Sequence, residues 1–111
     1  MTDRDRLARL QDIARLIRDR DLAELSQAHR ALTAIDRHLA ALDVPATAEA
    51  DPATALARQR YDIWADARRR LLLPERDRLA AARQLAAERA SRAFGRAAVL
   101  DRLLDRPPGK G

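Results

Sequence analysis

The residues most like catalytic groups in this chain are two histidines and a serine. His29 and His38 are the only histidines. Nine residues of helix turn through about 180° net, so the two face opposite ways and cannot hold a metal ion together. Ser26 precedes His29 by three residues, but no nucleophile elbow or oxyanion-hole motif accompanies the pair. We therefore expect no catalytic site, no cofactor and no metal.

The carboxylates also point away from catalysis, because most lie one helical turn from an arginine. Asp12 precedes Arg15 by three residues and Asp66 precedes Arg70 by four, spacings that support exposed helix surfaces. A catalytic carboxylate needs a concave, partly desolvated setting. Two paired helices offer none, so we predict a protein that is not an enzyme.

Arginine is better placed for recognition. The densest cluster is Arg68, Arg69 and Arg70, for which we expect a role in capturing an acidic protein partner. The alternatives are a solvated face balanced by Asp and a nucleic-acid backbone site. Nucleic acid is disfavoured because the nearby aromatic residues, Tyr61 and Trp64, fall near the predicted helix seam. A membrane-surface role is disfavoured because acidic and basic residues are mixed on both helices.

Trp64 is the only Trp in a chain with one Tyr and one Phe. It is either a core anchor or a hot spot for a partner, where Trp, Tyr and Arg are enriched. Ile63 and Trp64 are adjacent and cannot both point into one narrow seam. At least one large apolar side chain is therefore expected on the surface.

The composition indicates long helices as the elements that position these residues. The 111 residues are 47% hydrophobic and 35% charged with almost no aromatics, which is typical of coiled coils. The net charge is +5, and the basic excess lies in residues 52–111. The absence of Cys excludes disulfides and thiolate metal sites. No secretory signal or transmembrane span is apparent. We expect a cytoplasmic protein, acting either free or peripherally at the inner membrane face.

The apolar spacing predicts a first helix over residues 3–43, opened by a capping box of Thr2 and Asp5. Asp21 falls on the apolar stripe, where the register slips by a stutter. The predicted stripe consists of Leu7, Leu10, Ala14, Ile17, Leu25, Ala28, Leu32, Ile35, Leu39 and Leu42.

Residues 44–51 are predicted to form a loop, because Val44 precedes Pro45 and is pushed out of the helical region. Asp51 and Pro52 begin a second helix over 52–106, followed by a tail at 107–111. So short a loop predicts an all-α antiparallel two-helix coiled-coil hairpin, one domain over 1–111. The second stripe is weaker and Ala-rich: Ala57, Tyr61, Trp64, Leu71, Leu72, Leu79, Ala82, Ala86, Ala93, Ala97, Leu100 and Leu104.

Pro74 leaves two structures open. It removes a backbone hydrogen bond and clashes with the preceding turn, so it either kinks the second helix or splits it into 52–72 and 75–106, giving a three-helix fold-back. The kink is favoured because Leu73 is a poor N-cap and residues 71–73 contain no Gly or Asn.

Three segments resemble those of FliJ/YscO-type proteins, the stalks of flagellar and type III secretion export machines. They are the opening Leu7-Ala8-Arg9-Leu10 with Ile13 and Arg15-Leu16-Ile17, the stretch Trp64-Ala65-Asp66-Ala67-Arg68-Arg69, and Ala93-Phe94-Gly95-Arg96-Ala97. The resemblance would extend over nearly the whole chain. The short length and Pro74 depart from a straight-shaft geometry.

The resemblance implies an antiparallel helical hairpin that couples ATP hydrolysis to protein export. The end carrying both termini would enter the pore of a hexameric export ATPase, and the rest would reach the export gate, with export chaperones as further partners. The residues expected to face the ATPase pore are Arg4, Arg6, Arg9, Arg92, Arg96 and Arg102. Those expected to face the gate are Tyr61, Trp64, Arg68 and Arg69.

Two other functions stay open. A generic coiled-coil scaffold or chaperone would form a homodimer, a four-helix bundle that covers the Ala-rich seam. A basic coiled coil that binds nucleic acid would show a steep dependence of affinity on salt.

Overall fold

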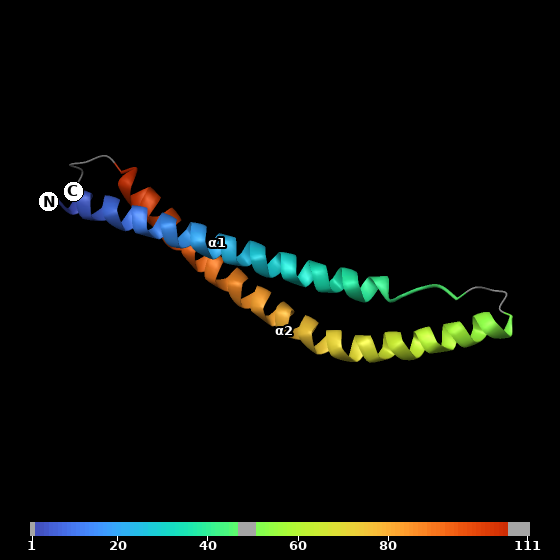
Figure 1. The fold of residues 1–111 in the computed structure, drawn as a ribbon. Helices are drawn as coiled ribbons and strands as arrows, with labels where there is room; N and C mark the ends of the chain where they lie inside the picture. The colour runs from blue at the N-terminus through green and yellow to red at the C-terminus, as the bar shows by residue number, and fades with distance from the viewer. Residues whose placement is uncertain (1, 47–50, 107–111) are drawn as a thin grey trace. The chain divides into compact units, whose positions relative to one another are not determined.

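A computed structural model of the chain describes residues 2–46 and 51–106. The described residues form two helices, α1 (Asp3–Ala41) and α2 (Pro52–Leu104), with no strand among them (Figure 1). The all-α helical hairpin is confirmed. Each helix ends two residues earlier than predicted. The loop at 44–51 is described only at 44–46 and 51, and the predicted tail at 107–111 lies outside the described residues.

The ends of the helices follow the predicted capping. The Asp5 amide donates to Thr2 Oγ1 at 3.1 Å and the Thr2 amide donates to Asp5 Oδ2 at 3.0 Å, which completes a capping box. At the start of α2 the Thr54 amide donates to Asp51 Oδ1 at 2.7 Å. These bonds to the charged form lower the pKa of both carboxyl groups, Asp5 through Thr2 and Asp51 through Thr54.

α2 continues through Pro74 as one helix, so the three-helix fold-back is wrong. Pro74 removes one backbone hydrogen-bond donor, but the helix is not interrupted there and no new N-cap follows. The absence of Gly or Asn at residues 71–73 explains this, because no residue there favours the left-handed conformation that commonly ends a helix.

The tertiary contacts fall into two compact units. Unit 1 comprises Met1–His29 and Ala82–Gly111, and unit 2 comprises Arg30–Ala81. Both helices contribute to both units. Unit 1 contains the early residues of α1 and the late residues of α2, and unit 2 contains the late residues of α1 and the early residues of α2, as antiparallel helices require. Whether they act as the expected single domain stays a prediction.

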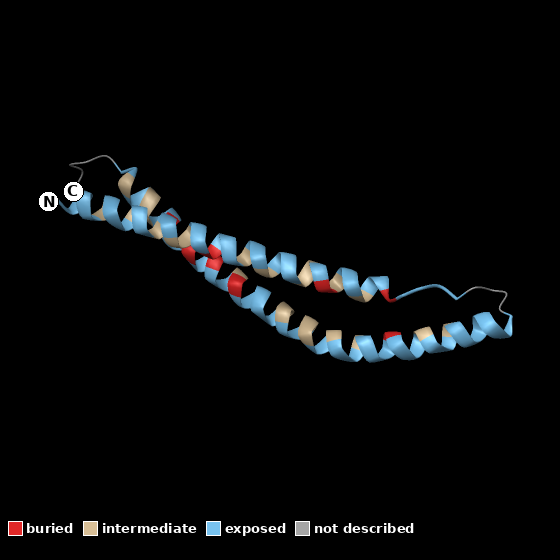
Figure 2. Ribbon diagram, in the orientation of Figure 1, coloured by how far each residue is buried: buried red, intermediate tan, exposed pale blue. Residues whose placement is uncertain are grey.

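The core of unit 1 consists almost entirely of alanine. Its buried residues are Asp21, Ala86, Ala90, Ala93 and Ala97, of which the last two are 1% exposed. Figure 2 colours the buried positions of both helices red. Alanine permits close approach of helices but buries little apolar area at each contact. Asp21 lies in the seam as predicted, 4% exposed, and accepts hydrogen bonds from Arg20 at 3.1 and 3.2 Å.

The core of unit 2 contains Ile35, Leu42 and Ala65. Ala65 is 1% exposed, whereas its neighbours Ile63 and Trp64 are 65% and 55% exposed. Both large side chains therefore lie outside the seam, and the core-anchor alternative for Trp64 is wrong. The small side chain at 65 takes the seam position because it allows the helices to approach.

The predicted stripe of α1 is confirmed except at Leu10, which is 51% exposed. That of α2 is wrong at four positions that are exposed and omits two alanines that are buried. The exposed positions are Ala57, Trp64, Leu71 and Ala82, and the omitted alanines are Ala65 and Ala90.

Candidate partner-binding surfaces

Several arginines predicted to meet partners are engaged within the chain. Arg4 donates to the backbone carbonyl oxygens of Leu104 at 2.6 Å and Arg106 at 3.3 Å. These are carbonyls that the end of α2 leaves without helical partners, and a cation there also complements the helix dipole. Arg4 thus holds the last turn of α2 against the start of α1 in unit 1.

Arg69 has the corresponding place at the end of α1. Its guanidinium donates to the Leu42 carbonyl oxygen at 3.3 Å, to Asp43 Oδ1 at 3.0 Å and to Asp66 Oδ1 at 3.0 Å. Tyr61 donates its hydroxyl proton to the same Leu42 oxygen at 2.8 Å. The polar ends of Arg69 and Tyr61 therefore close the end of α1 in unit 2.

The remaining arginines of the predicted site are exposed. Arg6 lies 3.8 Å from Asp3 in a well-solvated pair, which contributes little to stability. No ion pair with any residue in 2–46 or 51–106 is made by Arg9, Arg68, Arg70, Arg92, Arg96 or Arg102. These six guanidinium groups are available to a partner.

The aromatic residues of unit 2 border a shallow pocket of about 460 Å³. The Tyr61 and Trp64 rings lie 5.8 Å apart at an interplanar angle of 44°, and the Arg58 guanidinium lies 5.8 Å from the centre of the Tyr61 ring. The seven lining residues, which we call the Trp64 surface, are His38, Ala41, Leu42, Tyr61, Trp64, Arg68 and Leu72.

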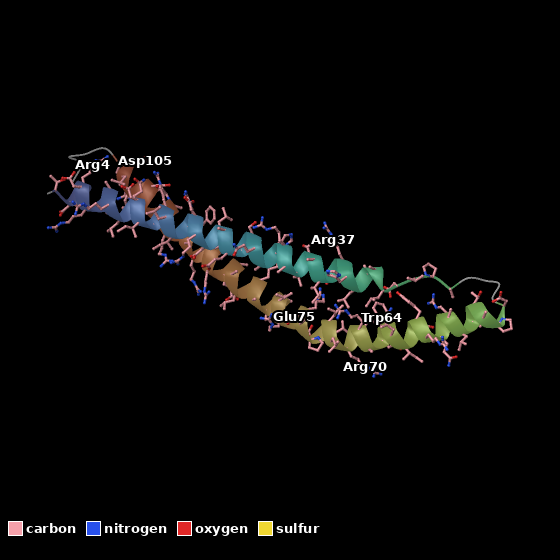
Figure 3. All side chains as sticks on the ribbon, in the orientation of Figure 1. Arg4, Arg37, Trp64, Arg70, Glu75 and Asp105 are labelled. Atoms are coloured by element: carbon pink, nitrogen blue, oxygen red, sulfur yellow. The ribbon has the colours of Figure 1, made fainter. Side chains whose placement is uncertain are left out.

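Consecutive residues of a helix are separated by about 100°, so Arg68, Arg69 and Arg70 face three directions. Arg68 lines the Trp64 surface, Arg69 meets the end of α1, and Arg70 projects from the side of α2 away from α1 (Figure 3). The structure therefore brings together only Tyr61, Trp64 and Arg68 of the gate-facing residues in one pocket.

Unit 1 carries a second and larger groove, of about 630 Å³, that the sequence did not lead us to expect. Its α1 wall is apolar, and Arg92 and Arg96 line its α2 wall. The nine lining residues, which we call the Ile13 groove, are Leu10, Ile13, Ala14, Ile17, Arg92, Gly95, Arg96, Val99 and Leu100. Ile13, an apolar residue outside the predicted stripe but next to its members Leu10 and Ile17 on the helix surface, was the signal that could have revealed it.

The opposite side of unit 1 is internally paired. Arg15 lies 3.0 Å from Asp101 Oδ1, to which Gln11 also donates at 2.6 Å. Chiefly through Gln11, and also through Arg15, these contacts hold the pKa of Asp101 below its ordinary value. The Arg18 guanidinium lies 5.6 Å from the centre of the Phe94 ring. The cations of this side are thus already engaged, unlike those of the Ile13 groove.

No family model, no curated protein and no solved structure matches this chain. Neither helix has a described stretch long and apolar enough to cross a membrane. Among the described residues, no three His, Asp or Glu side chains gather where they could hold a metal ion.

Proposed function

We propose that this chain is a non-enzymatic stalk or adaptor of a flagellar or type III protein export apparatus. It contacts the export ATPase through unit 1 and the export gate through the Trp64 surface. The hairpin fold and the resemblance of three of its segments to FliJ/YscO-type stalks support the proposal.

The observation that carries the binding role is the exposure of Trp64. Trp64 is 55% exposed, and it is one of only three aromatic residues in the chain. Contact of this large apolar side chain with water is unfavourable, and a partner that covers the side chain would remove that cost. Trp64 lies beside an arginine, Arg68, that makes no ion pair with the described residues. Trp and Arg are the residue types most often found at binding hot spots, where they bury apolar area and supply directed donors.

The proposal is tested by capture of two named components. The tagged chain, incubated with extract of cells that assemble the export apparatus, should retain the export ATPase and the export gate. The double variant Trp64→Ala/Arg68→Ala should retain much less of the gate, because both side chains leave the Trp64 surface.

A matched control removes the same kinds of side chain from another face of the same turns. Ile63→Ala/Arg70→Ala deletes an exposed apolar group and an exposed arginine outside the pocket. This variant should capture both components as the wild type does. Failure of the wild type to retain either component, or equal losses in the two double variants, would contradict the proposal.

A further inference from the structure

The Ile13 groove leaves apolar side chains in water without a partner. Leu10, Ile13 and Val99 are 51%, 52% and 50% exposed although they belong to one lined groove. We propose that this groove binds an amphipathic helix of another protein whose apolar stripe is bordered by carboxylates. The inference rests on the proposed protein-binding function and specifies the partner chemistry of unit 1.

The shape of the groove suits a helix. The apolar groups of α1 recur at every turn, as do Arg92, Arg96 and Leu100 on α2, so a third helix could place side chains between the two rows. Gly95 has no side chain, so the α2 wall of the groove projects less at this position. A Cβ atom built at this position meets nothing within 4 Å. The absent side chain thus leaves room for those of a partner.

The charge of the groove selects the partner's flanks. Arg92 and Arg96 line it, no carboxylate does, and neither arginine pairs with any acid in the described parts of the chain. Residues four apart lie one above the other along a helix, so the two arginines form a positive edge about one turn long. Carboxylates one turn apart on a partner helix would meet that edge with charge-assisted hydrogen bonds.

The same edge argues against a second copy of this chain. In a twofold dimer each groove would face an identical groove. Where the twofold axis runs across the helices, Arg92 and Arg96 of both copies would be brought towards one another, and in either arrangement the groove offers these arginines no carboxylate. Like charges placed together at an interface disfavour association.

Designed peptides test the inference on the full chain. One fluorescein-labelled peptide of about 18 residues, five helical turns, carries Leu at alternating three- and four-residue spacing with Glu on both flanks, and a second replaces every Glu by Lys. Fluorescence anisotropy should show saturable binding of the Glu peptide and at least about tenfold weaker binding of the Lys peptide. Arg92→Glu/Arg96→Glu should reverse this preference.

Gly95→Gln fills the groove without harming the helix, because Gln is a better helix former than Gly. It should weaken binding of the Glu peptide by about tenfold or more. The matched variant Ala98→Gln places the same side chain at an exposed position outside the groove and should bind as the wild type does. Circular dichroism verifies that both variants keep their helices.

The inference is overturned by equal affinities of the wild type and Gly95→Gln, or by the absence of saturable binding of the Glu peptide. It is also overturned if light scattering shows a dimer that Gly95→Gln dissociates, which would assign the groove to a second copy. If the Glu peptide does not bind but the chain still captures the ATPase and the gate, only the assignment of the groove is refuted. Peptide binding without such capture would support the groove and refute the export function.

Discussion

At the scale of single residues, tertiary position decides what each arginine does. Arg69 stands between two other arginines in sequence, yet only Arg69 reaches the end of α1. A substitution of all three would therefore combine a structural loss with the loss of accessible charges at Arg68 and Arg70. The three positions have to be tested separately.

Arg69→Ala should lower the free energy of unfolding by about 1 kcal/mol, since hydrogen bonds to Leu42, Asp43 and Asp66 disappear at a partly exposed site. Urea unfolding followed by circular dichroism measures the change. The neighbouring Arg70→Ala removes an exposed side chain and should stay within about 0.5 kcal/mol of the wild type. Equal destabilisation by both would refute the structural role of Arg69.

Asp101 should make the stability of unit 1 depend on acid. Its pKa is held below the ordinary 3.8 by Gln11 and Arg15. The folded state therefore binds the proton less tightly than the unfolded state. The stabilisation is complete above the unfolded value and is lost as the pH falls from there through the lower folded value. Between pH 7 and pH 3, the melting temperature of Asp101→Asn should fall less than that of the wild type.

Gln11→Ala removes the main cause of this pKa shift while keeping the carboxyl group. It should reproduce the smaller loss on acidification. The Asp101 account fails if the wild type and both variants lose the same number of degrees over the same pH interval.

At the scale of the elements, the stripe of α1 could be predicted because its seam contains large apolar residues such as Leu25, Leu32 and Ile35. The register of α2 could not be read as well, because its seam is built from alanines that look like any other helix-surface residue. Reading by side-chain size assigned Trp64 to the seam, where Ala65 lies instead. Ala65 and not Trp64 occupies the seam because the two helices approach closely there, and the sequence alone does not give the distance between the helices.

The Ile13 groove shows a second limit of sequence reading. Leu10 was assigned to the seam, although its neighbour in space is Ile13 on the adjoining face. The contacts of Arg4 with Leu104 and Arg106 join residues about a hundred positions apart, so they depend on how the two helices meet. Local capping by Thr2 and Asp51, in contrast, depends only on residues a turn away and was predicted correctly.

Substitutions at Gly95 test whether this glycine lowers the stability of α2 while it leaves the groove open. Gly95→Ala should raise the free energy of unfolding by about 1 kcal/mol, because Ala is the better helix former and its Cβ meets open space. Ala98→Gly, at an exposed position three residues later, should lower it by a similar amount. Chemical denaturation measures both changes. A Gly95→Ala variant less stable than the wild type would show that the site lacks the free space the structure gives it.

At the scale of the whole molecule, the two candidate surfaces are formed by different residues. The Ile13 groove belongs to unit 1 and the Trp64 surface to unit 2, and they have no residue in common. Both combine exposed apolar side chains with arginines that make no ion pair with the described residues. The proposed stalk function requires one surface for each of two components, and unit 1 and unit 2 each carry one.

Single and double variants should therefore separate the two partners. Ile13→Asp places a carboxylate in the groove and should weaken capture of the export ATPase about tenfold, leaving the gate unaffected. Trp64→Ala should weaken capture of the gate by a similar factor and leave the ATPase unaffected. Because the surfaces share no residue, the double variant should show both losses without a further one. Quantitative pull-down with each purified component measures this. A single variant that weakens both captures equally would mean that one surface serves both partners, and the proposal of a separate surface for each partner would have to be abandoned.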